Sequence, residues 1–225
     1  MTTVRLFLVG DSTVSSYDSS RAPRAGWGQV LHNYLNDQIE IRNEAASGRS
    51  SKSFLDEKRF VPVEEIIESS DILIIQFGHN DEKEDPERHT EPFTTFQQYL
   101  TTYIELALEK GASPILVTPV QRRSFDEQGV FFETHGDYPL AIKELGKRLD
   151  VPVIDLGEKS KQLLESLGPE ASKKLFLWFE PGEEENYPNG EKDDTHFSEY
   201  GANKIAQLVI DECKNHSLPL VDYID

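Results

Sequence analysis

The stretch VRLFLVGDSTVSSY, Val4 to Tyr17, begins with a run of six residues of which five are apolar, and this run ends abruptly in Gly-Asp-Ser-Thr. The apolar run is typical of a buried β-strand. Because Asp, Ser and Thr commonly cap helices and shape turns, the polar block has a simple structural interpretation. The alternative is that Ser12 is a nucleophile held at the end of a strand. The rest of the chain has to decide between the two.

Four more short apolar runs follow along the chain, and segments with helical periodicity lie between them. The further strand candidates are IEIRNE (39–44), ILIIQF (72–77), PILVTP (114–119) and VPVIDL (151–156). The helix candidates are GWGQVLHNYLND (26–37), VPVEEIIESS (61–70), PFTTFQQYLTTYIELALEKG (92–111), GDYPLAIKELGKRL (136–149), KSKQLLESLG (159–168) and SEYGANKIAQLVIDECKNH (198–216). Strands that alternate with helices in this way predict an α/β fold whose parallel sheet is covered on both faces.

The least regular region is FLWFEPGEEENYPNGEKDDTH (176–196), which is rich in Pro, Gly and Glu, and we expect a long loop there. Loops of this length within compact domains are often functional. No linker, repeat or second domain is evident in the sequence. We therefore expect one domain over residues 1–225.

Small polar residues follow each of the first four strand candidates. The segments are GDST (10–13), AASGRS (45–50), GHND (78–81) and TPVQRR (118–123). In open parallel sheets, ligands bind beyond the carboxyl ends of the strands. We expect these loops to meet at one edge of the sheet and to form a site there.

A serine nucleophile needs a base, because its hydroxyl is weakly nucleophilic at neutral pH. Of the six histidines, His196 stands out because it lies in Asp-Asp-Thr-His, just before the last helix candidate. A carboxylate three residues earlier on a turn can accept from Nδ1–H, which leaves Nε2 free to take the serine proton. Spacing alone does not choose between Asp193 and Asp194 for this role. Both, with Ser198, also suit a capping role at the start of the final helix.

Acyl transfer also needs hydrogen-bond donors for the developing oxyanion. Gly48 is a candidate because a loop glycine lets its backbone N–H approach closely, and Asn80 offers a side-chain amide. Each has a structural alternative: a turn with positive φ at Gly48, and an Asx-turn or cap at Asn80. Taken together with the serine and the histidine, the combination favours a catalytic site.

With this combination the chain resembles the SGNH (GDSL-type) hydrolases. Gly-Asp-Ser, a glycine after the second strand, Gly-x-Asn-Asp and Asp-x-x-His all occur in the order of that family. The resemblance implies the SGNH hydrolase fold, a three-layer α/β/α sandwich around a five-stranded parallel sheet with flavodoxin-like strand order. It also implies Ser12 as nucleophile, oxyanion donors from Ser12, Gly48 and Asn80, and His196 as a base oriented by Asp193.

Finer features resemble the rhamnogalacturonan acetylesterase family. They include GDST, GWGQ (26–29), NEAASGRSSKSF (43–54), FGHND (77–81), TPVQRR (118–123), ETHGDYPLAIKEL (133–145) and DDTHFSEYGA (193–202). Thr13 stands where many relatives carry leucine, a position without a catalytic role in this scheme. The resemblance implies a carbohydrate O-acetylesterase that acts on pectic oligosaccharides through an acetyl-serine, with no cofactor. The alternatives are a general short-chain or lipolytic esterase, a carbohydrate-binding relative without activity, and a nucleotide-binding domain, although no Gly-x-Gly-x-x-Gly or Walker loop is present.

Basic and aromatic residues near the expected site suggest substrate contacts. One hypothesis is that cations in these loops attract an acidic, galacturonate-bearing substrate; the alternative is ordinary surface charge. The residues concerned are Arg49, Lys52, Arg122 and Arg123. His79 and His135 suit packing, loop hydrogen bonds or substrate contact. Aromatic side chains for sugar rings are available at Trp178, Phe179 and Tyr187.

The composition narrows the class of protein further. The chain has 23 basic and 41 acidic residues, a net charge of −18, which argues against nucleic acid as a partner. No apolar run has the length of a membrane span. We read the single cysteine, Cys213, as a core residue, and one cysteine with no signal-peptide pattern leads us to expect a cytoplasmic protein. The histidines show no paired metal-ligand spacing, so we expect no metal.

Overall fold

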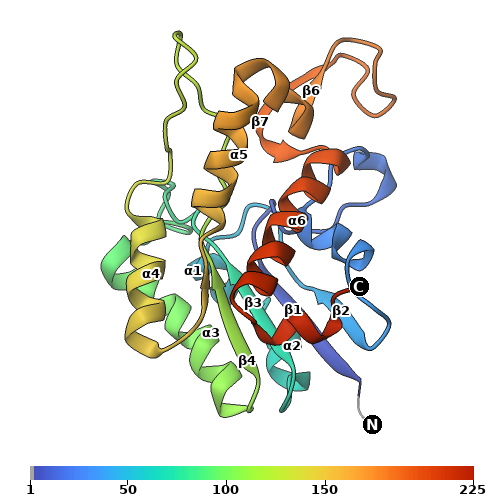
Figure 1. Ribbon diagram of the computed structural model, residues 1–225. Coiled ribbons are helices and arrows are strands. Elements are labelled where there is room, and N and C mark those ends of the chain that lie inside the picture. Colours follow the sequence, from blue (N-terminus) through green and yellow to red (C-terminus); the bar gives the residue numbers. More distant parts are fainter. Residues whose placement is uncertain (1–2) are drawn as a thin grey trace.

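Five parallel strands form the central sheet of the computed structural model, which describes residues 3–225. They are β1 (Val4–Gly10), β2 (Ile39–Asn43), β3 (Ile72–Gln76), β4 (Ser113–Val117) and the short β5 (Val153–Ile154). Their order in the sheet is β2-β1-β3-β4-β5 (Figure 1). This is the flavodoxin-like order, and the predicted three-layer α/β/α fold is confirmed.

Helices cover both faces of this sheet. One face carries α1 (Ser51–Asp56), α2 (Val61–Ile66), α3 (Gln97–Glu109) and α4 (Tyr138–Leu149). The other face carries the 3-10 helix η2 (Trp27–Asn33), α5 (Leu156–Ala171) and α6 (Glu199–Asn215), of which α6 lies in front of the sheet in Figure 1. Shorter helical segments are the 3-10 helices η1 (Ser19–Arg21), η4 (Ser172–Leu175) and η5 (Pro219–Tyr223) and the π-helix η3 (Pro92–Phe96). No helix within residues 3–225 is both long and apolar enough to cross a bilayer.

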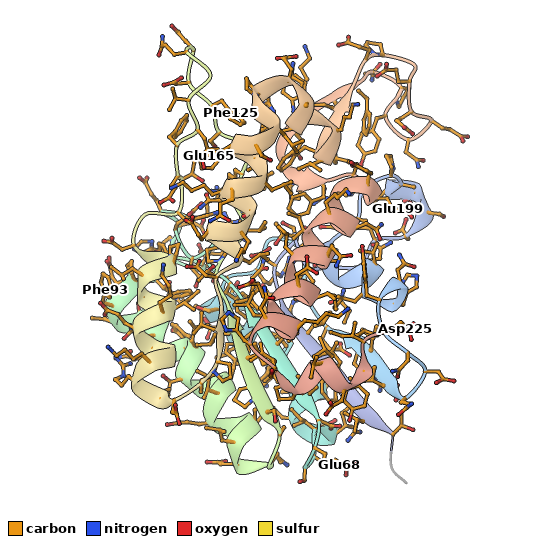
Figure 2. All side chains as sticks on the ribbon, in the orientation of Figure 1. Glu68, Phe93, Phe125, Glu165, Glu199 and Asp225 are labelled. Carbon is orange, nitrogen blue, oxygen red and sulfur yellow. The ribbon has the colours of Figure 1, made fainter. Side chains whose placement is uncertain are left out.

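The two-residue period of the strands divides the interior into two apolar cores. In β1, Leu6 and Leu8 pack with Trp27 and the buried face of α6, whereas Phe7 and Val9 pack with the helices on the opposite face. Figure 2 shows the side chains that fill the space between the sheet and both helix layers. With side chains buried on both faces, β1 is firmly held, and this fixes the position of the loop that follows it.

Residues 176–196 form a hairpin, not the long loop expected from the sequence. Its strands are β6 (Phe176–Phe179) and β7 (Glu191–Phe197), which pair in antiparallel fashion with Leu177 opposite Asp193. The residues that suggested a loop are confined to the turn at 180–190. The expectation was wrong because the composition of the turn masked the short strands on either side. The hairpin lies beyond the carboxyl ends of the parallel strands, at the upper right of Figure 1.

Two other elements differ from the sequence analysis. The segment 26–37 forms only the 3-10 helix η2, because the chain there is held by loop contacts, including a bond from Trp27 N–H to Thr13 O of 2.8 Å. Helix α1 was not anticipated; Ser50 caps it by accepting from Ser53 N–H at 3.1 Å, and Ser53 Oγ accepts from Ser50 N–H at 2.9 Å.

Candidate active site

The site lies at the carboxyl ends of β1 and β3, which are neighbours in the sheet. Successive strands are added on one side of β1 and then, from β3 onward, on its other side, so the strand order reverses between these two strands. Gly10, the last residue of β1, is paired with Gln76, the last residue of β3. A Cβ atom at Gly10 would lie 2.6 Å from Gln76 O, so only glycine fits this close approach. The Gly-Asp-Ser block therefore begins with a residue that the packing of the two strands requires.

Ser12 is held rigidly by its neighbours in the chain. Asp11 is fully buried, and one of its carboxylate oxygens accepts from Thr13 N–H at 2.9 Å and from Thr13 Oγ at 2.8 Å. Burial raises the pKa of Asp11, against the effect of these two bonds. On the other side, the Tyr17 hydroxyl donates to Ser12 O at 2.6 Å. Asp11 and Tyr17 thus fix the loop, and the Ser12 side chain is left for other contacts.

A chain of hydrogen bonds joins Ser12 to His196 and Asp193, which lie 184 and 181 positions further along the sequence. Ser12 Oγ is 3.0 Å from His196 Nε2, and His196 Nδ1 is 2.6 Å from Asp193 Oδ2. Asp193 Oδ1 accepts from the backbone N–H groups of Thr195 and His196 at 2.7 and 3.0 Å. Burial alone would raise the pKa of Asp193, but these bonds and the imidazole charge lower it to about 2.

The geometry also separates Asp193 from Asp194, the two candidates that spacing left open. Asp194 Oδ1 lies 2.7 Å from Arg123 Nη1 and accepts from Trp178 Nε1 at 2.8 Å, on the other side of the hairpin. Asp193 alone contacts the imidazole of His196. Successive residues of β7 point to opposite faces, which explains why the two carboxylates have different partners.

Candidate oxyanion donors occur in the loops that follow β1, β2 and β3. Within residues 3–225, the backbone N–H groups of Ser12 and Gly48 have no acceptor. Gly48 has φ of 80°, in the left-handed region that favours glycine. Asn80 is held on both sides: Nδ2 donates to Arg49 O at 3.1 Å, and Arg88 donates to Oδ1 at 3.3 Å. One amide hydrogen of Asn80 therefore remains free, as in an oxyanion hole.

Asp81 connects two of these loops through hydrogen bonds, a structural role that was not expected from the sequence. Its fully buried carboxylate accepts from Ser51 Oγ at 2.5 Å, from Ser51 N–H at 3.1 Å, from Gly78 N–H at 3.1 Å and from Thr90 Oγ1 at 3.1 Å. Burial raises the pKa of Asp81 to about 7, against the effect of the Ser51 and Thr90 bonds. The Gly-x-Asn-Asp block was the available signal, because its last residue ties the Asn80 loop to the start of α1.

His79 and His135 lie below the surface, where they pack against each other with ring centroids 4.4 Å apart. They are 3% and 1% exposed, and Nε2 of each donates to Val120 O at 2.9 Å. Burial lowers the pKa of His79 well below its usual range, and the neighbouring His135 and Arg122 add to this effect. Packing and loop hydrogen bonds, including the 3.0 Å contact of His135 Nδ1 with Glu82 Oε2, thus hold both histidines, and their contact with a substrate stays a prediction.

The arginines suggested as substrate contacts are each engaged by a carboxylate. Arg49 pairs with Glu57 at 3.0 Å, Arg122 with Glu82 at 2.5 Å and Arg123 with Asp194 at 2.7 Å. The Arg123 side chain is only 10% exposed, and it also donates to Pro169 O. Arg122 and Arg123 pair with residues distant in sequence, Glu82 and Asp194, so these two ion pairs could not be read from local composition.

Trp178 is half-buried, and its indole N–H donates to Asp194 Oδ1 at 2.8 Å, on the face of the hairpin opposite Asp193. The cations of Lys173 and Arg123 lie 4.6 and 4.9 Å from its ring centroid.

Among residues 3–225, no group of three or more His, Cys, Asp or Glu side chains has the arrangement of a metal site.

Comparisons with known proteins agree with this geometry. A family model described as GDSL-like Lipase/Acylhydrolase matches residues 6–209. The chain is 51% identical over 221 residues to the rhamnogalacturonan acetylesterase RhgT of Bacillus subtilis (strain 168), covering 98% of this chain and 94% of that protein. It is 26% identical over 225 residues to a rhamnogalacturonan acetylesterase of Emericella nidulans, covering 91% of this chain and 82% of that protein.

The fold has a similar match among solved structures. The crystal structure of protein YXIM from Bacillus subtilis superimposes with a TM-score of 0.82 at 27% identity, covering 96% of this chain and 58% of that longer one. The matched family segment contains the Ser12, Gly48, Asn80 and His196 positions in the order that the motifs predict. The resemblance drawn from the sequence is therefore confirmed, and this chain belongs to the GDSL-like lipase/acylhydrolase family.

Proposed function

We propose that this protein is an acetylesterase that removes O-acetyl groups from rhamnogalacturonan oligosaccharides. The observation that carries the proposal is the hydrogen-bonded chain Asp193–His196–Ser12, with distances of 2.6 and 3.0 Å, together with three N–H donors in the loops after β1, β2 and β3. The substrate class follows from the 51% identity to a rhamnogalacturonan acetylesterase over nearly the whole of both chains. The reaction needs no cofactor, because the side chains supply a nucleophile, a base and an oxyanion hole.

The first half of the reaction transfers the acetyl group to the enzyme. Ser12 Oγ attacks the acetyl carbonyl carbon while His196 Nε2 takes the hydroxyl proton. The negative charge that develops on the carbonyl oxygen is stabilised by the N–H groups of Ser12 and Gly48 and by the Asn80 amide. His196 then gives the proton to the departing sugar oxygen, so that the deacetylated sugar leaves and acetyl-serine remains.

The second half reverses these roles. A water molecule takes the place of the sugar, His196 accepts its proton, and the resulting hydroxide attacks the acetyl-serine. Acetate leaves and Ser12 regains its proton from the imidazole. Asp193 remains ionised throughout, because its pKa of about 2 lies far below neutral pH. Its negative charge stabilises the imidazolium that forms in both halves.

The proposal is tested by acetate release from acetylated rhamnogalacturonan oligosaccharides, with wild type compared to Ser12→Ala. The matched control is Ser16→Ala, which removes the same hydroxyl from an exposed position four residues on. We expect Ser12→Ala to abolish release and Ser16→Ala to retain it. A series of p-nitrophenyl acetyl, butyryl and octanoyl esters identifies the acyl preference.

The outcomes distinguish the proposed acetylesterase from a general short-chain or lipolytic esterase. Ser12-dependent activity on the synthetic acetyl ester, with none on the oligosaccharide, would retain the mechanism and reject the substrate. A preference for octanoyl esters would instead indicate a lipolytic enzyme. Equal activity of Ser12→Ala and wild type on every ester would reject Ser12 as the nucleophile.

A further inference from the structure

Arg24 differs from the arginines discussed above because its guanidinium forms no ion pair within residues 3–225. Arg49, Arg122 and Arg123 are each paired with a carboxylate in this strongly acidic chain. Of the Arg24 guanidinium nitrogens, only Nη2 has a hydrogen-bond partner in the described part of the chain. Nε is buried and has no acceptor. The charge of Arg24 is thus not balanced by a neighbouring side chain.

The position of this cation is close to the nucleophile. Arg24 Nη2 donates to the Tyr17 hydroxyl at 3.0 Å, and this hydroxyl donates to Ser12 O at 2.6 Å. The guanidinium also lies over the Tyr17 ring, 4.4 Å from its centroid. The backbone of Arg24 pairs with Ser198, two residues after His196. Two hydrogen bonds therefore separate the guanidinium from the backbone of Ser12.

A cavity of about 270 Å³ adjoins this arginine. Its lining includes Tyr17, Asp18, Ala22, Arg24, Gln29 and Glu199. Glu199 is labelled in Figure 2 at the N-terminal end of α6, beside the catalytic hairpin. The two acids in the cavity do not neutralise Arg24: Asp18 accepts from Ser20 N–H at 2.9 Å, and Glu199 is exposed.

We propose that Arg24 binds the carboxylate of a uronic acid residue of the acetylated oligosaccharide. This inference rests on the proposed function, because it assigns the acidic part of that substrate to a residue. A guanidinium with free donors favours a carboxylate over a neutral hydroxyl, since the charge-assisted hydrogen bond is the stronger. Stacking on Tyr17 holds the guanidinium plane in place before the ligand arrives, so less side-chain freedom is lost on binding.

The test compares acetylated rhamnogalacturonan oligosaccharides with the same oligosaccharides after their carboxyl groups have been reduced to alcohols. In Arg24→Gln we expect kcat/KM on the acidic form to fall by about 10- to 100-fold, the range of one charge-assisted hydrogen bond, mostly through KM. On the reduced form, kcat/KM should change by less than about twofold. Arg24→Lys should lose part of the preference, because an ammonium keeps the charge without the planar fork.

The matched control is Arg21→Gln, which removes the same charge three residues earlier. Arg21 is exposed, and it too forms no ion pair in the described part of the chain. This variant should behave like wild type on both forms. A loss common to the acidic and the reduced substrate in Arg24→Gln, carried by kcat, would overturn the proposal and assign Arg24 to positioning Ser12 through Tyr17. Unchanged kinetics on both forms would also overturn it.

Failure of the proposed function gives a different result. If wild type releases no acetate from either oligosaccharide, the substrate assignment fails, and the role of Arg24 is then read from inhibition of p-nitrophenyl acetate hydrolysis by digalacturonate. A weaker inhibition of Arg24→Gln than of wild type and Arg21→Gln, by about tenfold, supports carboxylate binding. Equal inhibition of all three proteins, or none, overturns it. Thermal unfolding and the Arg24→Lys variant identify any loss that comes from misfolding.

Discussion

Replacing Asp193 by asparagine tests the contact between this carboxylate and His196 while the side chain keeps its size. Asp193 Oδ1 accepts from two backbone N–H groups, whereas Oδ2 faces His196 Nδ1 at 2.6 Å. In Asp193→Asn the amide oxygen should keep the two backbone bonds, because an amide nitrogen at that position would meet only donors. The amide nitrogen then donates to Nδ1, so the imidazole proton moves to Nε2. His196 therefore loses the acceptor that faces Ser12 Oγ.

The substitution should affect kcat and the stability of the fold by very different amounts. The wrong tautomer of a triad histidine costs about 10⁴-fold in kcat in serine hydrolases, or about 5 kcal/mol of transition-state stabilisation. The stability of the protein should change much less. Lowering the pKa of Asp193 from 3.8 to about 2 stabilises the folded state by about 2 kcal/mol at neutral pH. Most small domains tolerate a loss of this size, so Asp193→Asn should remain folded.

The assay is the initial rate of p-nitrophenyl acetate hydrolysis, with unfolding by urea measured on the same preparation. Asp194→Asn is the matched control, because it makes the same chemical change one residue further along. Asp194 contacts Arg123 and Trp178, not the imidazole, so its replacement should leave kcat within about a few-fold of wild type. Equal losses of kcat in the two variants would refute the reasoning. An Asp193→Asn enzyme with more than about a tenth of wild-type kcat would refute it as well.

Three further predictions follow from the same contacts. Asn80→Ala should lower kcat by about 100-fold with little change in KM, measured on p-nitrophenyl acetate, because its amide acts on the developing oxyanion; a change confined to KM would contradict this. Arg123→Met should lower the free energy of unfolding by about 2 kcal/mol, because the side chain contacts Asp194 and donates to Pro169 O. KM for acidic oligosaccharides should be unchanged; a raised KM at normal stability would instead indicate that Arg123 binds the substrate. The stability that Asp193 provides should be complete above about pH 5 and lost as the pH falls towards about 1, so the difference in stability between wild type and Asp193→Asn should shrink steadily over this range in urea titrations. A difference that stays constant from about pH 5 to about pH 1 would contradict the assignment.

The sheet and the loops after its strands were predictable because their signals are local. An apolar run such as Val4 to Val9 is typical of a buried strand, and parallel strands place the residues that follow them at one edge. Gly48 and Asn80 were found in this way. The pairing of Asp193 with His196 was suggested by spacing, but the choice of Asp193 over Asp194 came only from the resemblance. The structure supplies the physical reason, since the two side chains leave β7 on opposite faces.

The environment of the charged residues was not predictable from the sequence. Whether an arginine faces a ligand or a carboxylate depends on residues far away in the chain, as with Arg123 and Asp194. Local composition left Arg123 as either a substrate contact or an ordinary surface charge, whereas the structure pairs it with Asp194. Arg24 was overlooked for the converse reason, because it lies in a turn-rich segment whose sequence resembles an ordinary loop. Only the contacts show that its charge is unbalanced beside Ser12.

The proposed nucleophile and the proposed base are held by different parts of the fold, and the site depends on how these parts are joined. Ser12 is fixed by the buried strand β1, whereas His196 lies at the end of the hairpin, next to the start of α6. Ala25 N–H donates to Phe197 O at 3.1 Å, and Ser198 N–H donates to Leu175 O at 3.1 Å. The first bond ties the segment after Ser12 to the hairpin, and the second joins the residues that flank the two hairpin strands. Both involve backbone atoms, so the 3.0 Å contact between Ser12 and His196 is maintained by the fold and not by the catalytic side chains alone.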